Sequence, residues 1–137
     1  MNVRINLGSL KVSNSIFTNG KASLISAKKS TVVLDSVTIK NSEDLISEGH
    51  GLYCDTCNVR VTNSTFTNLK AFKTPAIYIK NHESKQSTDL EEYMQLIESS
   101  TFEDNHALGS FGAIKLENAG NVLIKQNMFS RNVVSDE

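Results

Sequence analysis

The chain has 137 residues, of which 39% are hydrophobic and 21% charged, and its formal net charge at pH 7 is -1. This length and balance are typical of one globular domain rather than a disordered chain. A charge so close to zero offers no field to hold phosphates, which argues against nucleic acid and anionic membranes as partners. No apolar run approaches the roughly 20 residues of a membrane-spanning helix, so we expect no membrane span in this segment.

The first predicted element lies at the N-terminus, where residues 1–7 alternate apolar and polar side chains. Such alternation predicts a β-strand. The segment lacks the continuous apolar stretch of a leader peptide. A chain that opens inside a strand is expected to be a segment of a longer protein. We therefore treat residues 1–137 as one segment with no internal domain boundary.

A repeated motif of eight or nine residues then runs through the chain. Residues 12–19 return closely as 61–68, and looser copies span 34–41, 97–105 and 124–132. Each copy carries one large apolar residue, with spacings of 22, 27, 36 and 27 residues between successive copies. These steps match the coils of a solenoid with one insertion. The apolar residues are Phe17, Ile39, Phe66, Phe102 and Phe129.

A second short strand is predicted between successive copies of the motif, at residues 22–25, 51–53, 75–79 and 112–116. Each segment alternates over a few residues and lies near a turn-forming residue. Every coil would then supply a strand, a turn, a second strand and a second turn, stacked in parallel on its neighbours. The sequence predicts an all-β fold, a right-handed parallel β-helix of about five partial coils.

An asparagine ends each copy of the motif. Asparagine tolerates the left-handed backbone region that a sharp bend needs, and its amide can bond the amide of the next coil, as in stacked identical strands. We therefore predict a structural ladder along the tube. Its members would be Asn19, Asn41, Asn68, Asn105 and Asn132.

The insertion lies at residues 81–95. Thr88-x-x-Glu91 within it fits a helix capping box, which predicts a loop with about two helical turns. Insertions between coils either form solvated loops or carry function in solenoids. The insertion is therefore a candidate contact for partner proteins.

The last third of the chain resembles the β-helix repeats of polymorphic outer-membrane proteins, whose signatures are Phe-x-x-Asn and Gly-Gly-Ala-Ile. The matching segments are 102–105, 111–114 and 129–132, with Phe111 in place of the first glycine. This resemblance implies an extracellular or cell-surface location. It also implies a passive structural or adhesive scaffold with no reaction of its own.

The middle of the chain is similar to the wider pectin-lyase-like superfamily, and in particular to polygalacturonases. Gly49-His50-Gly51 matches one motif of these enzymes, and Tyr78-Ile79-Lys80 stands where they carry Arg-Ile-Lys. Their paired aspartates have no counterpart, although glycoside hydrolysis by this route needs two carboxyl groups. We therefore expect no catalytic residue, no cofactor and no metal site, and we interpret His50 as an exposed turn residue.

Two further short motifs remain to be interpreted. Cys54-x-x-Cys57 leaves three alternatives open, namely a local disulfide, two buried thiols or a redox pair. Asn63-Ser64-Thr65 is a glycosylation sequon. Because it lies inside the repeat strand, its asparagine is expected to point into the coil, which makes its modification doubtful.

Tyr53 and Tyr78 are predicted to point outward at corresponding places on neighbouring coils. Such a pair either packs across the coils or binds sugar rings. Three functional hypotheses follow: a non-catalytic structural or adhesive segment, a carbohydrate-binding or degenerate polysaccharide-degrading helix with His50, Tyr53, Tyr78 and Lys80 on one face, or a subunit that binds partners through 81–95. In each case the tube ends would expose strand edges. We expect neighbouring coils of the same longer chain, or other proteins, to cap them.

Overall fold

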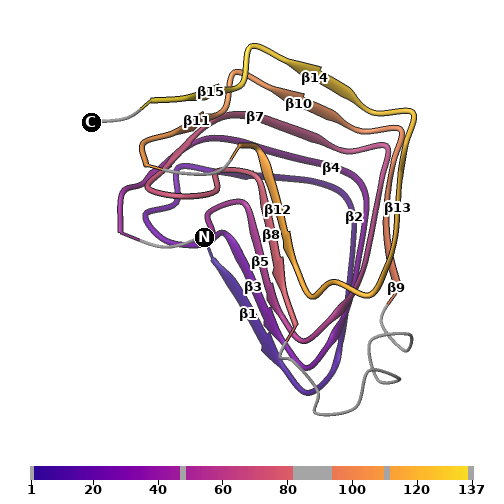
Figure 1. Ribbon diagram of the computed structural model, residues 1–137. Coiled ribbons are helices and arrows are strands. Elements are labelled where there is room, and N and C mark those ends of the chain that lie inside the picture. Colours follow the sequence, from indigo (N-terminus) through magenta and orange to yellow (C-terminus); the bar gives the residue numbers. More distant parts are fainter. Residues whose placement is uncertain (1, 47–48, 82–93, 110–111, 136–137) are drawn as a thin grey trace.

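The computed structural model describes residues 2–46, 49–81, 94–109 and 112–135 of the chain. These residues form fifteen β-strands, and every strand pairing is parallel. Seen along its axis, the chain winds as stacked coils around a three-sided tube (Figure 1). Within the described ranges there is no helix that could span a membrane. Most of the predicted 81–95 insertion, including Thr88 and Glu91, lies outside the described residues.

The first of the three sides is a five-stranded sheet, which we name side A. Its strands, in spatial order, are β1 (Val3–Asn6), β3 (Ile25–Lys28), β5 (Leu52–Asp55), β8 (Ile77–Lys80) and β12 (Ile114–Glu117). The two long strands β2 (Ser9–Thr18) and β4 (Thr31–Asp44) run over both of the other sides.

Side B consists of the first halves of β2 and β4 followed by β6 (Asn58–Thr62), β9 (Met94–Glu98) and β13 (Asn121–Lys125). Side C consists of the second halves of β2 and β4 followed by β7 (Thr65–Ala71), β10 (Thr101–Glu103) and β14 (Met128–Ser130). The short strands β11 (His106–Ala107) and β15 (Val133–Val134) extend side C. The expectation of two strands per coil was therefore wrong, since one copy of the sequence motif covers parts of two sides.

Left-handed backbone at fixed positions bends the chain between the sides. All of these residues have φ between 46° and 62°. Corner 1, between sides B and C, is formed by Asn14, Ser36, Asn63, Ser99 and Gln126, and corner 2, five positions later in each coil, is formed by Asn19, Asn41, Asn68, Asp104 and Arg131. Corner 3, after side A, is formed by Leu7, Lys29, Thr56 and Asn118. Fewer than half of these residues are asparagine, so the tertiary register imposes the bend even where the side chain does not favour it.

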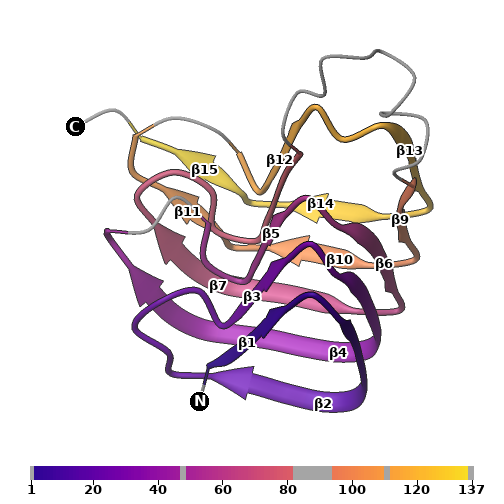
Figure 2. The same cartoon turned by 90° about the horizontal axis from the view of Figure 1, so that it is seen from below.

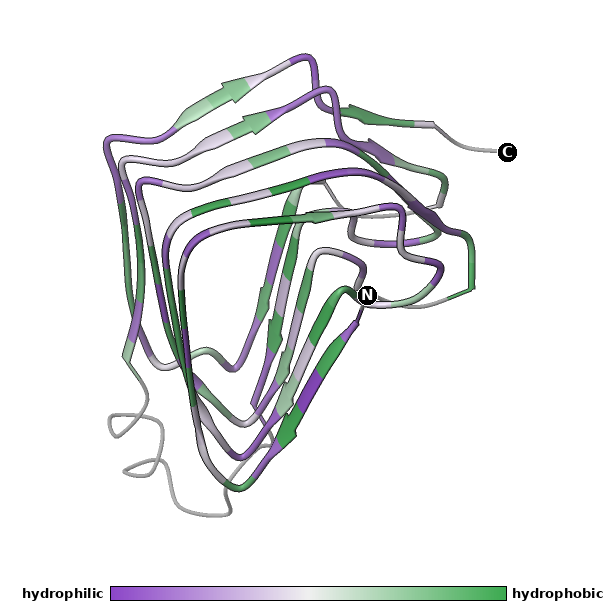
Figure 3. Ribbon diagram, turned by 180° about the vertical axis from the view of Figure 1, so that it is seen from behind, coloured by the Kyte–Doolittle hydropathy of each residue, from purple (hydrophilic) through white to green (hydrophobic). Residues whose placement is uncertain are grey.

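The predicted interior column is confirmed. Phe17, Ile39, Phe66, Phe102 and Phe129 are register partners of one another on side C, coil after coil. The rings of the last three stack, with centroids 5.1 and 4.9 Å apart. Apolar residues of all three sides meet in the same core, and they alternate along the strands with polar ones (Figure 3).

A second interior feature is a set of hydroxyl groups just after the corners. Ser64 Oγ donates to the carbonyl of Thr62 (2.8 Å) and accepts the N–H of Val37, one coil closer to the N-terminus (3.1 Å). It thereby satisfies a buried N–H that faces no strand partner. The same two bonds are made by Ser30, Ser42 and Ser100.

The five asparagines predicted as one ladder occupy two different columns. Asn19, Asn41 and Asn68 are exposed corner residues, and Asn68 Nδ2 donates to Asn41 Oδ1 (2.9 Å). Asn105 and Asn132 lie one position later and point into the tube, where Asn105 Nδ2 donates to Asn132 Oδ1 (2.9 Å). The single ladder is therefore wrong, because Asp104 and Arg131 take the corner position in those two coils.

The coils stack from β1 and β2 at one end to β12–β15 at the other (Figure 2). Among the described residues, the strands at both ends pair with a neighbour on one edge only. Interior-facing residues of the last coil are consequently exposed, and Phe129 is 52% exposed while Phe102 is fully buried.

Candidate functional site

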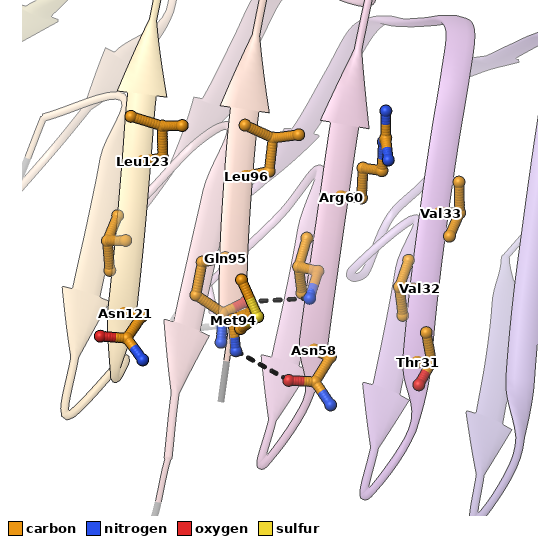
Figure 4. Close-up of a pocket in the computed structure, with 12 residues that line it drawn as sticks. Thr31, Val32, Val33, Asn58, Arg60, Met94, Gln95, Leu96, Asn121 and Leu123 are labelled. Carbon is orange, nitrogen blue, oxygen red and sulfur yellow. Dashed lines mark hydrogen bonds between the residues drawn. The ribbon is translucent and has the colours of Figure 1, made fainter. Parts of the chain in front are cut away.

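An apolar hollow lies on the outer face of side B. It has a volume of about 510 Å³ and lies over the first residues of β4, β6, β9 and β13 (Figure 4). Because side chains alternate along a strand, every second residue of these strands faces the hollow. Its outward lining comprises Thr31, Val33, Asn58, Arg60, Met94, Leu96, Asn121 and Leu123. We call this hollow the side B groove.

The groove is lined mainly by aliphatic side chains from neighbouring coils. Val33, Arg60, Leu96 and Leu123 are successive partners in one outward column. The amide of Asn58 is occupied locally, because its Oδ1 accepts the N–H of Met94 (2.9 Å). Arg60 is an exposed cation beside aliphatic side chains. The arrangement suits binding of an elongated, partly apolar ligand, and the described residues that line it include no acid–base pair.

A polar hollow adjoins the groove toward corner 1 and shares Val33 and Arg60 with it. Asp35 Oδ1 accepts hydrogen bonds from Thr62 Oγ1 (2.7 Å) and Asn63 Nδ2 (3.1 Å). These bonds stabilise the carboxylate and lower the pKa of Asp35. Glu98, two coils after Asp35, pairs with Lys125 (2.9 Å). The Asp35 carboxylate is thus held ionised by its hydrogen bonds, and the Glu98 carboxylate is engaged in an ion pair.

His50 lies inside the tube, and the prediction that it is an exposed turn residue was wrong. The side chain is completely buried. Its backbone N–H donates to the carbonyl of Thr74 (3.1 Å), which draws this segment against the next coil. The Nδ1 atom is 3.9 Å from Asp44 Oδ2. Burial lowers the pKa of His50, while the Asp44 carboxylate opposes that effect.

The other three residues predicted to bind carbohydrate lie on side A, so His50 does not share a face with them. Tyr53 and Tyr78 are register partners, with ring centroids 5.4 Å apart in an edge-to-face arrangement. Lys80 follows two positions later on β8.

Tyr78 points to the outer face as predicted, but only 2% of it is exposed. Its hydroxyl donates to Glu117 (2.8 Å), and the ammonium of Lys115 lies 4.6 Å from its ring centroid. The hydroxyl and Lys115 also lower the pKa of Glu117. These contacts describe a packing pair that stabilises side A, with the half-buried Tyr53 as its more accessible member.

Cys54 and Cys57 are both buried free thiols, so the predicted disulfide is not formed. Their mutual hydrogen bond, together with burial, raises the pKa of Cys54. The same hydrogen bond lowers the pKa of Cys57. Of the three alternatives, the geometry matches two buried thiols in the core.

Asn63 of the sequon is exposed at corner 1. The expectation that it points into the coil was wrong, because the left-handed corner residue turns its side chain outward. The amide bonds to Asp35 on the surface. It is therefore accessible to modification.

The side B groove was not predicted from the sequence. Its outward column becomes visible only when the strands of side B are aligned in register as a side of their own. A count of three strands per coil would have aligned Val33, Arg60, Leu96 and Leu123. Among the described residues, no three His, Cys, Asp or Glu side chains gather as a metal site would require.

The family model for the "Right handed beta helix region" matches residues 2–135, nearly the whole chain. The chain belongs to the right-handed β-helix family. The parallel pairing and the coil-to-coil columns agree with this membership and are consistent with the pectin-lyase-like superfamily. No similar curated protein and no similar solved structure was found for this right-handed β-helix.

Proposed function

We propose that this right-handed β-helix is a non-catalytic structural or adhesive segment of an extracellular or cell-surface protein. One observation carries the proposal: the residues that catalysis would draw on are separated by the wall of the tube. His50 is inside, Tyr53 and Lys80 are outside on side A, and Asp35 is engaged on side B. Asp35 and Glu98 line one hollow of side B, but Asp35 is hydrogen-bonded to Thr62 and Asn63 and Glu98 is paired with Lys125, whereas glycoside hydrolysis requires two carboxyl groups that act on the substrate.

The outer faces instead show charge pairs between adjacent coils, which suit a stiff surface. Arg131 bonds Glu103 (2.6 Å) and Asp104 (2.7 Å) of the preceding coil. Such exposed pairs contribute little stability each, on the order of 0–1 kcal/mol. They nevertheless fix neighbouring coils in register along a rod that can present a binding face.

Incubation with polygalacturonate tests the absence of catalysis. We expect neither new reducing ends nor unsaturated uronates above a heat-inactivated control. Turnover that is lost in Lys80→Ala but kept in Lys40→Ala, a lysine on side C, would contradict the proposal. Labelling of intact and permeabilised source cells with an antibody to the chain tests the surface location.

Carbohydrate binding without catalysis is the second candidate. It is favoured by Tyr53 beside Tyr78 on side A, and by the cation Arg60 over the apolar side B groove. The chain has no tryptophan, and two of its three tyrosines, Tyr53 and Tyr78, lie on side A, so tyrosine fluorescence of a Tyr93→Phe variant reports on side A. Titration with uronic-acid oligosaccharides should show saturable binding, with Tyr53→Ala and Arg60→Ala distinguishing the two faces. Unchanged binding in both variants would remove both faces from consideration.

A role as an assembly subunit that contacts partners through residues 81–95 is the third candidate. Deletion of residues 82–93 with a short Gly-Ser linker from Asn81 to Met94 tests it. Loss of partner binding with an unchanged circular dichroism spectrum would support the insertion as the contact, and retained binding would exclude it.

A further inference from the structure

Cys57 stands just after corner 3, where the preceding coil carries a hydroxyl group. In that coil, Ser30 Oγ donates to the carbonyl of Lys28 (2.7 Å) and accepts the N–H of Gly8 (3.3 Å). Cys57 makes the same two bonds, because its Sγ donates to the carbonyl of Asp55 (3.5 Å) and the backbone N–H of Ser30 bonds to the same sulfur. The thiol therefore occupies a capping position that suits a serine.

Hydrogen bonding alone does not account for a cysteine at this cap. A thiol is a weak donor and its sulfur a weak acceptor, whereas a hydroxyl group donates and accepts at full strength. The position is buried, with 1% of Cys57 exposed, so water does not make up the difference. A second thiol beside it supplies another explanation.

Cys54 is that second thiol, and it also lies inside the tube. Its register partners on side A are Ala27 and Ile79, so an aliphatic side chain would suit its position. The corner residue Thr56, with φ of 62°, turns the chain so that the cysteines on either side of it both face the core. The two thiols share a hydrogen bond. Sulfur atoms already in contact are placed to form an S–S bond, which is about 2 Å long.

The hydrogen bonds around the pair remain satisfied when the thiols are oxidised. The Asp55 carbonyl accepts from the Cys57 thiol but also accepts the N–H of Lys29 (2.8 Å), so it keeps a donor when the thiol hydrogen is lost. The sulfur of Cys57 keeps lone pairs for the N–H of Ser30. No buried group of this cap loses its only partner, which is the loss that makes a buried hydrogen bond costly to break.

We propose that Cys54 and Cys57 are a redox-active dithiol, which a small-molecule disulfide such as oxidised glutathione converts to an intramolecular disulfide across corner 3. The Cys57 thiolate attacks one sulfur of the glutathione disulfide, forms a mixed disulfide and releases one glutathione. Cys54 then attacks the Cys57 sulfur, and the mixed S–S bond breaks as the second glutathione leaves. Two cysteine thiols are oxidised to one disulfide, one glutathione disulfide is reduced to two thiols, and the cysteine protons pass to the glutathione sulfurs.

The order of the two steps follows from the surroundings of each sulfur. The hydrogen bond from Cys54 lowers the pKa of Cys57, and the same hydrogen bond together with burial raises the pKa of Cys54. Cys57 is therefore the attacking thiolate and Cys54 the resolving thiol. Because both sulfurs are enclosed, the rate of exchange is set by local opening of corner 3. This activity belongs to the interior of the tube and is independent of the function proposed for its outer faces.

Equilibration of the chain in mixtures of reduced and oxidised glutathione tests the proposal, with mass spectrometry after acid quenching to measure disulfide and dithiol. The decisive comparison is between native buffer and the same mixture in concentrated urea. Because the fold holds the two sulfurs in contact, we expect the ratio of disulfide to dithiol to be about tenfold higher in the folded chain, which corresponds to a reduction potential about 30 mV more negative.

Two variants separate a redox pair from two packed thiols. Cys54→Ala introduces the residue found at Ala27 in the same column, and Cys57→Ser introduces the residue found at Ser30 in the same cap, so both should fold, as circular dichroism checks. Oxidised glutathione should raise the urea midpoint of the unchanged chain, because the disulfide favours the folded state. It should not raise the midpoint of either variant.

Two outcomes would overturn the proposal. One is a ratio of disulfide to dithiol that is no higher in the folded chain than in urea. The other is a urea midpoint of the unchanged chain that oxidised glutathione does not raise. Either result would mean that the fold packs two thiols without favouring their oxidation. The results of sugar binding, partner binding and surface labelling do not bear on this test.

Discussion

Phe66 and Phe102 face each other in register on β7 and β10, and their rings stack within 13° of parallel. Both side chains are fully buried. Offset stacking at this distance adds about 0.5–1.5 kcal/mol to the burial of two large rings. The stack therefore couples the two coils that the 81–95 insertion separates in the sequence.

Truncation of Phe102 should be the most damaging change in the column. Phe102→Ala removes contacts with the rings on both sides, and we expect the free energy of unfolding to fall by about 3–5 kcal/mol. Chemical denaturation followed by circular dichroism measures it. Phe72→Ala is the matched control, because Phe72 is exposed. Similar losses in both variants would contradict the central role of the column.

Asn105 should matter more than the exposed corner asparagines. Its Oδ1 accepts the N–H of Leu69 and its Nδ2 donates to the carbonyl of Phe66, all in the buried interior. Asn105→Ala leaves both backbone groups unpaired, at about 1–3 kcal/mol each. Asn68→Gly removes a surface amide while keeping the left-handed corner, so denaturation should show a change below about 1 kcal/mol. The reverse order would refute the inner position of Asn105.

Stability should fall on mild acidification because of His50. Burial lowers its folded-state pKa below the ordinary 6.5. The unfolded chain therefore binds a proton that the folded chain resists, and stability declines as pH falls through about 6.5, by at most about 1.4 kcal/mol per pH unit. Unfolding free energies between about pH 7.5 and 5.5 measure the slope.

His50→Gln is the control for this pH dependence and should flatten the slope. Asp35, Asp104 and Glu117 have lowered pKa values, so they contribute stability that is lost only at more acidic pH. A slope that His50→Gln leaves unchanged would assign the effect to other groups.

The two cysteines should resist reagents in the folded protein. Both thiols are buried and share a hydrogen bond. A disulfide-exchange reagent should therefore modify them only when the tube opens. Ser13→Cys places a thiol on the exposed face of β2 and should react at once. Equal rates for the native thiols and the introduced one would show that the core around β5 is open.

The Phe column was predictable because a large apolar residue recurs at coil-sized spacing, and the register confirms it. Side B was not predicted as a separate side, because corner 1 has no consistent residue type: Asn14, Ser36 and Gln126 all occupy it. Left-handed backbone there is imposed by the stacking of coils, which a single coil's sequence does not encode.

The site was less predictable than the fold. Gly49-His50-Gly51 resembles a surface turn in sequence, yet Gly49 bridges to Thr74, the His50 N–H donates to the Thr74 carbonyl, and the His50 side chain is completely buried. The alternation rule correctly set Tyr78 on the outer face, but it carried no information on the contacts with Lys115 and Glu117 that cover it. Both features depend on residues more than twenty positions away.

The constant separation of five residues between corners 1 and 2 has a practical consequence for engineering. Corner 2 and corner 3 are separated by different lengths of chain, as from Asn19 to Lys29 and from Asn41 to Thr56. A foreign peptide grafted after Leu45 would thus enter a connection whose length already varies. One added residue between Ser36 and Asn41 would instead shift every later side chain to the opposite face of the wall. The protein should accordingly serve as a display rod whose cargo is carried along the connections between corners 2 and 3.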